Sequence, residues 1–461
     1  MSLRTKRTRS VTAAHATETI SKKRKTQEEI LQKDTEHALP AVQSALKLHA
    51  IRQPYNVATN HPLPALQHDS ELLVKVQAVG LNPIDWKAPD YNFGIPTLPY
   101  ISGREYAGRV VKVPSTPSPS SRQIKQGDLV LIPSTDYRDL RKAAFQEYSV
   151  ASSFNTIRLP PAISLNSGSI LGVAFVSAAL TLGICMGLDF SSIESGPDLL
   201  AIVRKLEPNS LPADIQQECL HGIGEKERIS AGDYIVIWGA SSVCANVTTQ
   251  IARLAGIKII SVADAARHAS RLSSTKAIAP DLIVDSHDPQ RAIEVIKANT
   301  GTRGARFGFD TMGKDTAGHL LNSLAVPTTT TTPSSPSCLP SVSANGAKAC
   351  ERRDSKLPTP PSTPLDTSSA SRKSHLVGLT GLPKGDVPKG VALHSVPIKL
   401  YHEVPQVGEA LSAWCERLLA KGLLVPPDVV GTVEGLAGVN AGLDRMRRRE
   451  VSGGRLVAVL K

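Results

Sequence analysis

The sequence predicts an α/β protein in which a loop-rich β domain is joined to a doubly wound parallel sheet. The first observation is that turn residues interrupt short strand-like runs, such as residues 72–76 and 108–113, up to about residue 165. The second is that helices alternate with short apolar strands from about residue 166, the pattern of βαβ units. The third is a last strand-like run, residues 455–460, which can return to the β domain and make it discontinuous.

Length and charge divide the chain of 461 residues into four parts. The net charge of +12 lies largely in short basic runs, two of which, KRTR and KKRK, fall in the first part. We interpret that part as a solvated, disordered tail, and a nuclear address or a phosphate-binding arm is left open. The expected parts are a basic tail (residues 1–45), the first part of the β domain (46–165), the parallel-sheet domain (166–400) and a part that completes the β domain (401–461).

Cysteine usage and hydropathy indicate a cytoplasmic protein without a membrane span. The six cysteines lack the close spacing of a zinc or redox motif, so we expect reduced thiols, and His394 and His402 are too dispersed to indicate a metal site. No apolar run approaches the about 18 residues of a membrane helix, and the nearest, residues 169–188, predicts a buried helix. The first residues have charge but no apolar stretch typical of a secretory signal.

The predicted parallel sheet is interrupted once and preceded by an extra stretch. Residues 326–373, with runs such as TTTTTPSSPS, are too rich in proline, serine and threonine to pack a core, so we expect a disordered surface insertion. Residues 184–230 either lie over a cleft or form a surface excursion. The strands of the sheet are expected at residues 234–238, 258–262, 281–284, 306–310 and 375–379.

Two helices of this region have apolar residues at helical spacing on one face. The spacing predicts that this face is buried in each helix. The residues concerned are Val243, Val247, Ile251 and Leu254 in the first helix and Val407, Leu411, Trp414 and Leu418 in the second.

The segment that begins at Tyr234 is a buried strand, a turn of small residues and a helix start. Such a turn brings backbone N–H groups at a helix N-terminus against the pyrophosphate of a dinucleotide. Gly239 permits the tight turn, and Ala245, in place of the last glycine of G-x-G-x-x-G, lets the helix approach the strand. The serines can donate to phosphate oxygens, and the degenerate pattern gains weight from its position between strand and helix. The expected cofactor contacts are Gly239, Ala240, Ser241, Ser242 and Val243.

The second strand of the sheet leads to an acid, Asp264. A carboxylate at this point accepts hydrogen bonds from the adenosine ribose, which favours NAD. Arg267, His268 and Arg271 follow, and a guanidinium can instead pair with the 2′-phosphate of NADP. The sequence therefore predicts NAD or NADP and leaves the choice open.

Several motifs now carry a family resemblance. VGLNPIDWK (residues 79–87), GREYAG (103–108), GDLV (127–130) and AFQEY (144–148) resemble the N-terminal domain of quinone oxidoreductases and fungal trans-acting enoyl reductases. These belong to the medium-chain dehydrogenase/reductase superfamily, which includes the zinc-containing alcohol dehydrogenases. The motifs GLTGLPK, HSVPIKLYHE and VSGGR near the end of the chain resemble fungal members.

The resemblance covers residues 46–325 and 374–461 and implies a catalytic GroES-like β domain assembled from both ends of the chain. It implies a Rossmann domain between these ends and an active site in the cleft. Zinc-dependent members have Gly-His-Glu where this chain has Gly103-Arg104-Glu105, and a cysteine where it has the neighbourhood of Asn82. The lobe that binds structural zinc is absent, so the resemblance implies chemistry without zinc.

The resemblance also assigns roles to single residues. Lys87 is the first candidate for stabilising developing negative charge or orienting the substrate, and Ser177 matches a residue that lines the nicotinamide pocket. Asn82 is expected to touch the nicotinamide ribose. Met312 and Gly313 lie where backbone commonly meets the nicotinamide. The remaining polar residues are expected to hold the loop (Asp85) or to lie in the core (Glu105 and Tyr148).

These observations favour an NAD(P)-dependent reductase that moves hydride to a carbonyl or an α,β-unsaturated carbonyl. The expected partner is a small-molecule substrate, such as a polyketide-type intermediate of fungal secondary metabolism. One alternative is a non-catalytic protein of this fold whose basic tail binds nucleic acid, although a nucleic-acid partner is not favoured; another is a zinc alcohol dehydrogenase. A homodimer is left open, and the substrate's identity is beyond the sequence.

Overall fold

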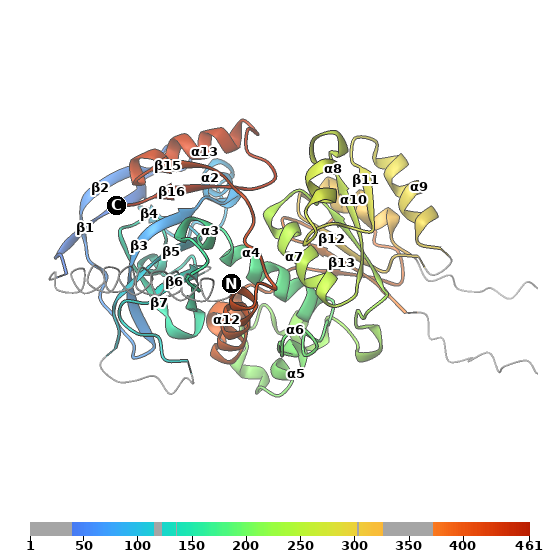
Figure 1. Ribbon diagram of the computed structural model, residues 1–461, viewed down its shortest axis with the longest axis horizontal. Helices are drawn as coiled ribbons and strands as arrows, with labels where there is room; N and C mark the ends of the chain where they lie inside the picture. The colour runs from blue at the N-terminus through green and yellow to red at the C-terminus, as the bar shows by residue number, and fades with distance from the viewer. Residues whose placement is uncertain (1–38, 115–121, 135, 302–303, 326–371) are drawn as a thin grey trace, which may run out of the picture.

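The computed structural model describes residues 39–114, 122–134, 136–301, 304–325 and 372–461. The predicted tail and the predicted insertion lie outside the described residues, apart from residues 39–45 and 372–373. Strand β1 (Val42–Leu48) begins within the range predicted as tail, because Ala45 and Leu46 already pack into a core. Figure 1 shows the β domain beside the parallel-sheet domain, with helix α4 (Gly172–Leu180) between them.

The β domain is built on a sheet with the strand order β15-β16-β3-β5-β6-β8, in which β7 also pairs with β3. β16 (Arg455–Val459) pairs antiparallel with β3 (Glu71–Gly80), so the end of the chain joins this domain. A second sheet has the order β2-β1-β4. The other elements are β2 (Asn56–Pro62), α2 (Pro83–Tyr91), β4 (Tyr100–Ile101), β5 (Glu105–Lys112), β6 (Leu129–Pro133), β7 (Tyr148–Ser152), β8 (Ile157–Arg158), β15 (Val429–Glu434) and α13 (Val439–Arg447).

Six parallel strands form the second domain, in the order β11-β10-β9-β12-β13-β14. Counted along the chain, this order is 3-2-1-4-5-6, that of the Rossmann fold. Successive residues of β9 alternate between apolar clusters on the two faces of the sheet, which explains the continuous apolar run. The strands are β9 (Tyr234–Trp238), β10 (Lys258–Ala263), β11 (Leu282–Asp285), β12 (Phe307–Asp310), β13 (Ser374–Gly378) and β14 (Val391–His394).

The predicted strands of this sheet are present within one residue at either end, and β14 is additional. It was not predicted because residues 379–390 before it have the composition of a loop. The predicted buried face of α7 is correct at Val243, Val247 and Ile251 but wrong at Leu254, which is 40% exposed at the helix end. The helices are α7 (Val243–Leu254), α8 (Ala265–Ser274), α9 (Pro289–Asn299) and α10 (Lys314–Ser323).

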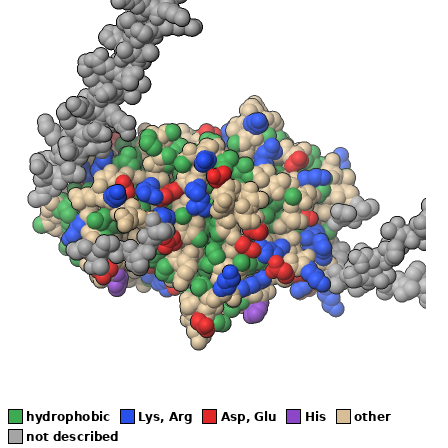
Figure 2. All heavy atoms as spheres, turned by 60° about the horizontal axis from the view of Figure 1, so that its bottom comes forward, with side chains coloured by type: hydrophobic (Ala, Val, Ile, Leu, Met, Phe, Trp, Pro, Cys, Tyr) green, Lys and Arg blue, Asp and Glu red, His purple; other side chains and the backbone are tan. Residues whose placement is uncertain are grey.

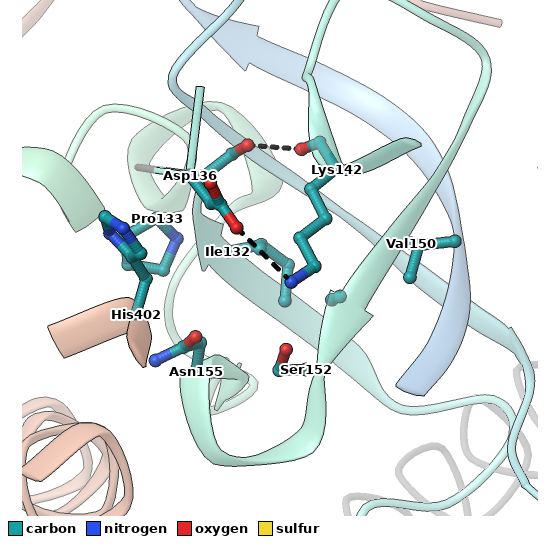
Figure 3. A pocket seen from close by; sticks show the side chains of 10 residues that line it. Ile132, Pro133, Asp136, Lys142, Val150, Ser152, Asn155 and His402 are labelled. Carbon is teal, nitrogen blue, oxygen red and sulfur yellow. Dashed lines mark hydrogen bonds and ion pairs between the residues drawn. The ribbon is translucent and has the colours of Figure 1, made fainter. Parts of the chain in front are cut away.

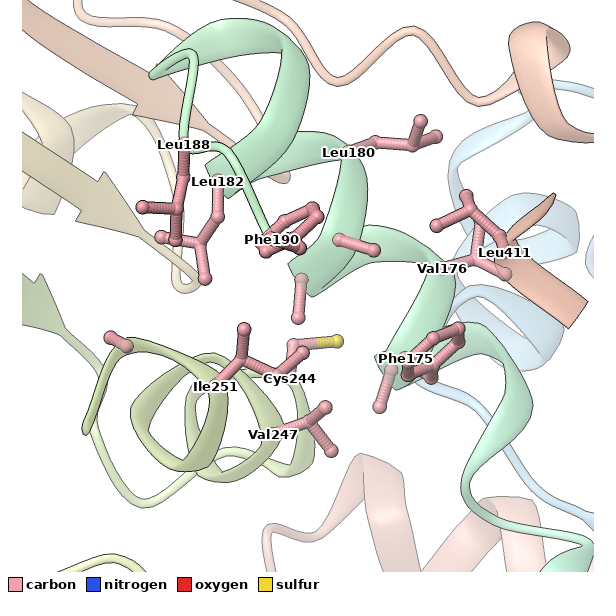
Figure 4. Packing of buried hydrophobic residues seen from close by; sticks show 14 of the residues in the cluster. Phe175, Val176, Leu180, Leu182, Leu188, Phe190, Cys244, Val247, Ile251 and Leu411 are labelled. Carbon is pink, nitrogen blue, oxygen red and sulfur yellow. The ribbon is translucent and has the colours of Figure 1, made fainter. Parts of the chain in front are cut away.

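One apolar helical stretch, Leu165–Cys185, runs between the domains. It combines α3 (Leu165–Gly168), α4 and a π-helical turn, η3 (Thr181–Cys185). The stretch has 21 residues, and a window of 18 of them has a mean hydropathy of 2.0, so it is long and apolar enough to cross a membrane; the expectation that no run approaches this length is wrong. In that window 94% is nevertheless buried inside the protein, in agreement with the predicted buried helix, and Figure 4 shows the stretch packed against α7.

The extra stretch, residues 184–230, packs into the core beside α4. Its helices α5 (Leu199–Val203) and α6 (Gln216–His221) share one apolar cluster with α12 (Pro405–Ala420), which follows α11 (Lys399–Glu403). Phe190 stacks on Trp414 of α12 with ring centroids 4.5 Å apart. The predicted surface excursion is therefore wrong, because this stretch contributes buried aromatic and aliphatic side chains.

Candidate cofactor-binding and active site

The turn between β9 and α7 requires glycine at its first position. Gly239 has a φ of 81°, in the left-handed region that disfavours side chains. A Cβ atom there would lie 2.4 Å from the hydroxyl oxygen of Thr311 and 2.5 Å from Cγ of Met312. The N–H groups of Gly239 and Ala240 both donate to the Val262 carbonyl at 3.0 Å. The turn is thus held against the ends of β10 and β12.

The N-terminus of α7 carries backbone donors that suit an anion. Ser242 caps the helix: its hydroxyl oxygen accepts from the Ala245 N–H at 3.1 Å, and its proton goes to Thr311 Oγ1 at 3.0 Å. This corrects the prediction that the Ser242 hydroxyl donates to phosphate, since it is committed within the protein. The N–H groups of Ser241 and Val243 have no acceptor among the described residues, so they and the helix dipole can hold a pyrophosphate.

Asp264 lies at the end of β10, but its carboxylate is partly committed. It caps α8, because Oδ1 accepts from the Arg267 N–H at 3.0 Å. Arg267 itself is exposed and has no ion pair within the described part of the chain. Arg271 reaches the turn instead, and its Nη2 donates to the Ser241 carbonyl at 3.3 Å. Asp264 therefore has basic neighbours in Arg267 and Arg271 and a second acid, Asp285, close to it, and the choice between NAD and NADP stays open.

In the loop after β12, backbone N–H groups point toward the buried side chain of Asp310. The N–H groups of Met312 and Gly313 donate to Asp310 Oδ1 at 3.0 and 2.8 Å, and burial raises the pKa of Asp310. Their N–H groups are thus occupied, whereas the Met312 side chain is 56% exposed and covers Gly239. If these two residues meet the nicotinamide, they do so through groups other than these amides.

A buried polar network lies in the β domain. Asn82 Nδ2 donates to Glu105 Oε1 at 3.0 Å and to the Gly80 carbonyl at 3.2 Å. Arg455 donates to both Asn82 Oδ1 and Glu105 Oε1, and Glu105 Oε2 accepts from the Val173 N–H at 2.9 Å. Both amide protons of Asn82 and one lone pair of its Oδ1 are therefore used inside the protein, and the expected contact with the nicotinamide ribose stays a prediction.

Sequence comparison relates the chain to known proteins. The model of the alcohol dehydrogenase GroES-like domain matches residues 68–161. A trans-enoyl reductase of Aspergillus niger is 26% identical over 301 residues, which are 63% of this chain and 66% of the relative. A trans-enoyl reductase of Gibberella fujikuroi is 24% identical over 409 residues, 87% of this chain and 94% of the relative. With several other relatives, the match spans about half to two thirds of their length.

Solved structures share the arrangement of both domains. A quinone oxidoreductase of Escherichia coli, complexed with NADPH, has a TM-score of 0.58 at 16% identity and covers 90% of this chain and 99% of its own. An enoyl reductase named CurK has a TM-score of 0.58 at 15% identity, with coverages of 91% and 99%. The GroES-like match, the relatives and the shared two-domain fold together support a medium-chain dehydrogenase/reductase.

Lys87 is a half-buried cation on α2. Its ammonium lies 5.7 Å from the centroid of the Trp86 ring, and it has no hydrogen bond or ion pair among the described residues. Asp85 in the same helix fixes the preceding loop, because its Oδ2 accepts from the Asn82 N–H at 2.7 Å. Burial raises the pKa of Asp85 to about 6, against the lowering influence of the Asn82 N–H.

Ser177 lies on α4, where this helix packs against α7. The residue is buried, and its hydroxyl is a hydrogen-bond partner of the Cys244 thiol in the first turn of α7. Burial raises the pKa of Cys244, and the charges of Arg455 and Glu105 also act on it. The side chain of Cys244 points toward α4 in Figure 4, so the first turn of α7 meets α4 through this thiol and Ser177.

Arg104 occupies the position at which zinc-dependent family members have histidine. Its side chain is buried, and its guanidinium lies 5.4 Å from the centroid of the Tyr137 ring. Its Nε has no hydrogen-bond partner among the described residues. A buried guanidinium offers no lone pair to a metal and places a positive charge there.

A small pocket lies in the β domain, away from the residues of the cofactor turn. It has a volume of about 20 Å³, room for about one water molecule. Figure 3 shows its lining side chains, among them Asp136, Lys142 and His402, and no predicted site residue is part of it. The cavity therefore adds nothing to the cofactor site.

Two residues of the site were missed by sequence reasoning. Thr311 follows the buried Asp310, and its hydroxyl also approaches the carbonyls of Trp238 and Gly239 at 3.2 and 3.0 Å. Its only sequence signal was its position directly after a parallel strand. Arg455 lies in the VSGGR motif, but its partners Asn82 and Glu105 lie more than 300 residues earlier in the chain.

Proposed function

We propose that this protein is a zinc-independent, NADPH-dependent reductase of carbonyl or α,β-unsaturated carbonyl compounds. The observation that carries the proposal is the glycine turn at the N-terminus of α7 with unpaired N–H groups at Ser241 and Val243. The names of the relatives as trans-enoyl reductases, and of structural neighbours as quinone oxidoreductases with NADPH, support an oxidoreductase. The proposed localisation is the cytoplasm.

The residues of the cleft fit a nicotinamide dinucleotide. A side chain at Gly239 would collide with Thr311 and Met312, so the turn can close only around glycine. The N–H groups of Ser241 and Val243, which have no acceptor among the described residues, suit a pyrophosphate. When bound, the cofactor supplies the hydride. The protein's part is to stabilise the charge that develops on the substrate oxygen, and the unpaired ammonium of Lys87 is the group we assign to it. Asp85 and Asn82 position the helix that carries Lys87.

Lys87→Met tests this assignment. Without the cation, kcat should fall by about 10² to 10³, while the dissociation constant of NADPH stays within about twofold of the wild type. The assay is NADPH oxidation with a series of enones, and NADPH affinity is measured by fluorescence. Lys112→Met, which removes an exposed lysine of β5, is the matched control. Equal kcat in the two variants contradicts the role of Lys87.

We propose NADPH rather than NADH because the carboxylate of Asp264 is used by the helix cap while Arg267 and Arg271 flank it. A guanidinium is the group that pairs with a 2′-phosphate. Paired titrations should show that Arg267→Ala weakens the binding of NADPH and leaves the binding of NADH unchanged. If only Asp264→Ala weakens the binding of NADH, and Arg267→Ala changes the binding of neither dinucleotide, NAD is the cofactor.

The proposed substrate is a small polyketide-type enone, and the cleft is proposed to work without zinc, because Arg104 and Asn82 stand where ligands are needed. Ser177 is proposed to line the nicotinamide pocket. A nucleic-acid role through the basic tail falls outside the described residues. On the face drawn in Figure 2, lysine and arginine side chains lie among acidic and apolar ones, and no single basic patch dominates that face. A homodimer is a further proposal, which sedimentation can test.

A further inference from the structure

A second polar cluster lies away from the cofactor turn, where η3, α6 and β14 meet. Cys185, Glu218 and His394 place their ligand-type atoms within 4.8 Å of one another. Cys185 is fully buried and His394 is 1% exposed, whereas the Glu218 side chain is 19% exposed. Sequence spacing did not indicate this cluster, because its members come from three distant segments. We propose that it binds a divalent metal ion of the zinc type.

The donor set matches this ion. Thiolate, imidazole and carboxylate are the zinc ligands of proteins, and three of them leave a fourth position for water. A thiolate and a carboxylate together neutralise the charge of a divalent cation in a buried site. Without the ion, the Cys185 thiol has a weak contact with the Ser395 carbonyl at 4.0 Å and a side-chain hydrogen bond with Glu218. The thiol therefore already lies against another candidate ligand of the ion.

The surroundings of His394 also fit a metal ligand. Its Nδ1 faces the cluster, 2.7 Å from Glu218 Oε1, and its Nε2 faces Nδ1 of His375 at 2.9 Å. A histidine that binds a metal through one nitrogen carries a proton on the other and needs an acceptor for it. His375 is fully buried, its ring stacks on Phe307 at 5.6 Å, and it supplies that acceptor.

The cluster needs only a small movement to take the ion. Tetrahedral ligands lie about 3.3 Å apart, somewhat more than the distance between His394 Nδ1 and Glu218 Oε1. Glu218 is the member best able to move, because it is the partly exposed one and lies on the short helix α6. Its exposed side also gives the ion a path from solvent. Cys185 ends the π-helical turn η3, and such turns occur often at functional sites.

The test uses the full chain, stripped with a chelator, loaded with Zn²⁺ and passed through gel filtration. We expect elemental analysis to find about one zinc per chain, and Co²⁺ in its place to show thiolate-to-metal absorption. Cys185→Ser and His394→Gln should abolish that absorption. His375→Phe keeps an aromatic ring but removes the nitrogen acceptor, and should weaken metal binding by about 10- to 100-fold.

Two control variants separate this cluster from other binders. Cys415→Ser removes another buried cysteine, and His287→Ala disrupts the exposed group of Asp264, Asp285 and His287. Both should keep the metal and its spectrum. Wild-type protein that retains no zinc, or whose Co²⁺ complex lacks thiolate absorption, overturns the proposal whether or not the variants fold. Loss of metal in His287→Ala but not in Cys185→Ser overturns it as well.

Discussion

The turn after β9 is made of consecutive residues and works through backbone groups, whereas the network around Glu105 joins distant segments through buried side chains. In the turn, glycine is required at position 239 by its φ and by the closeness of Thr311, and backbone N–H groups are the ones we propose to bind the cofactor. In the network, Asn82, Glu105 and Arg455 satisfy one another away from water. The turn is therefore specified by consecutive residues, whereas the network forms only when the whole chain has folded.

The largest expected effect is on the network. Arg455→Met leaves Glu105 as a buried carboxylate without its cation, so the free energy of unfolding should fall by about 3–5 kcal/mol. Denaturant unfolding followed by fluorescence measures it. The double variant Arg455→Met with Glu105→Gln should be less destabilised than the single variant, because no uncompensated charge remains. If the two losses simply add, the network is not the coupled unit described here.

The turn offers the next test. Gly239→Ala places a Cβ against Thr311 and Met312 at a positive φ, so we expect about 2–3 kcal/mol of destabilisation and loss of NADPH binding. Gly232→Ala is the matched control: φ is 88° there, but no atom lies within 4 Å of the added Cβ. It should cost only about 1 kcal/mol and leave NADPH binding intact. Equal effects of both variants would mean that the strain of φ alone matters, and not the closure of the turn.

The same difference explains what the sequence could and could not predict. β9, its glycine turn and α7 are continuous, so hydrophobic spacing and small residues sufficed to locate them. The Ser242 hydroxyl was misassigned because a residue's cap role depends on where the helix begins, which the sequence leaves uncertain by a few residues. Thr311 and Arg455 were missed because each meets its partners only when strands far apart in the chain become neighbours. His394 and Cys185 were missed for that reason too.

The smallest expected effect sharpens the comparison through pH. The folded-state pKa of Asp85 is raised from 3.8 to about 6, first by burial and then by Glu105, while the Asn82 N–H, Arg104 and Arg455 lower it. A carboxyl whose pKa is raised on folding stabilises the fold when protonated, and that stability is lost as pH rises through the folded pKa. The difference in unfolding free energy between wild type and Asp85→Asn should therefore change by on the order of 2 kcal/mol between pH 4 and pH 7, in favour of the variant at the higher pH. Asp69→Asn, an exposed carboxylate, should show no such change. A flat difference for Asp85 would mean that Arg104 and Arg455 hold it ionised, and that the β-domain side of the cleft is more strongly cationic than its burial implies.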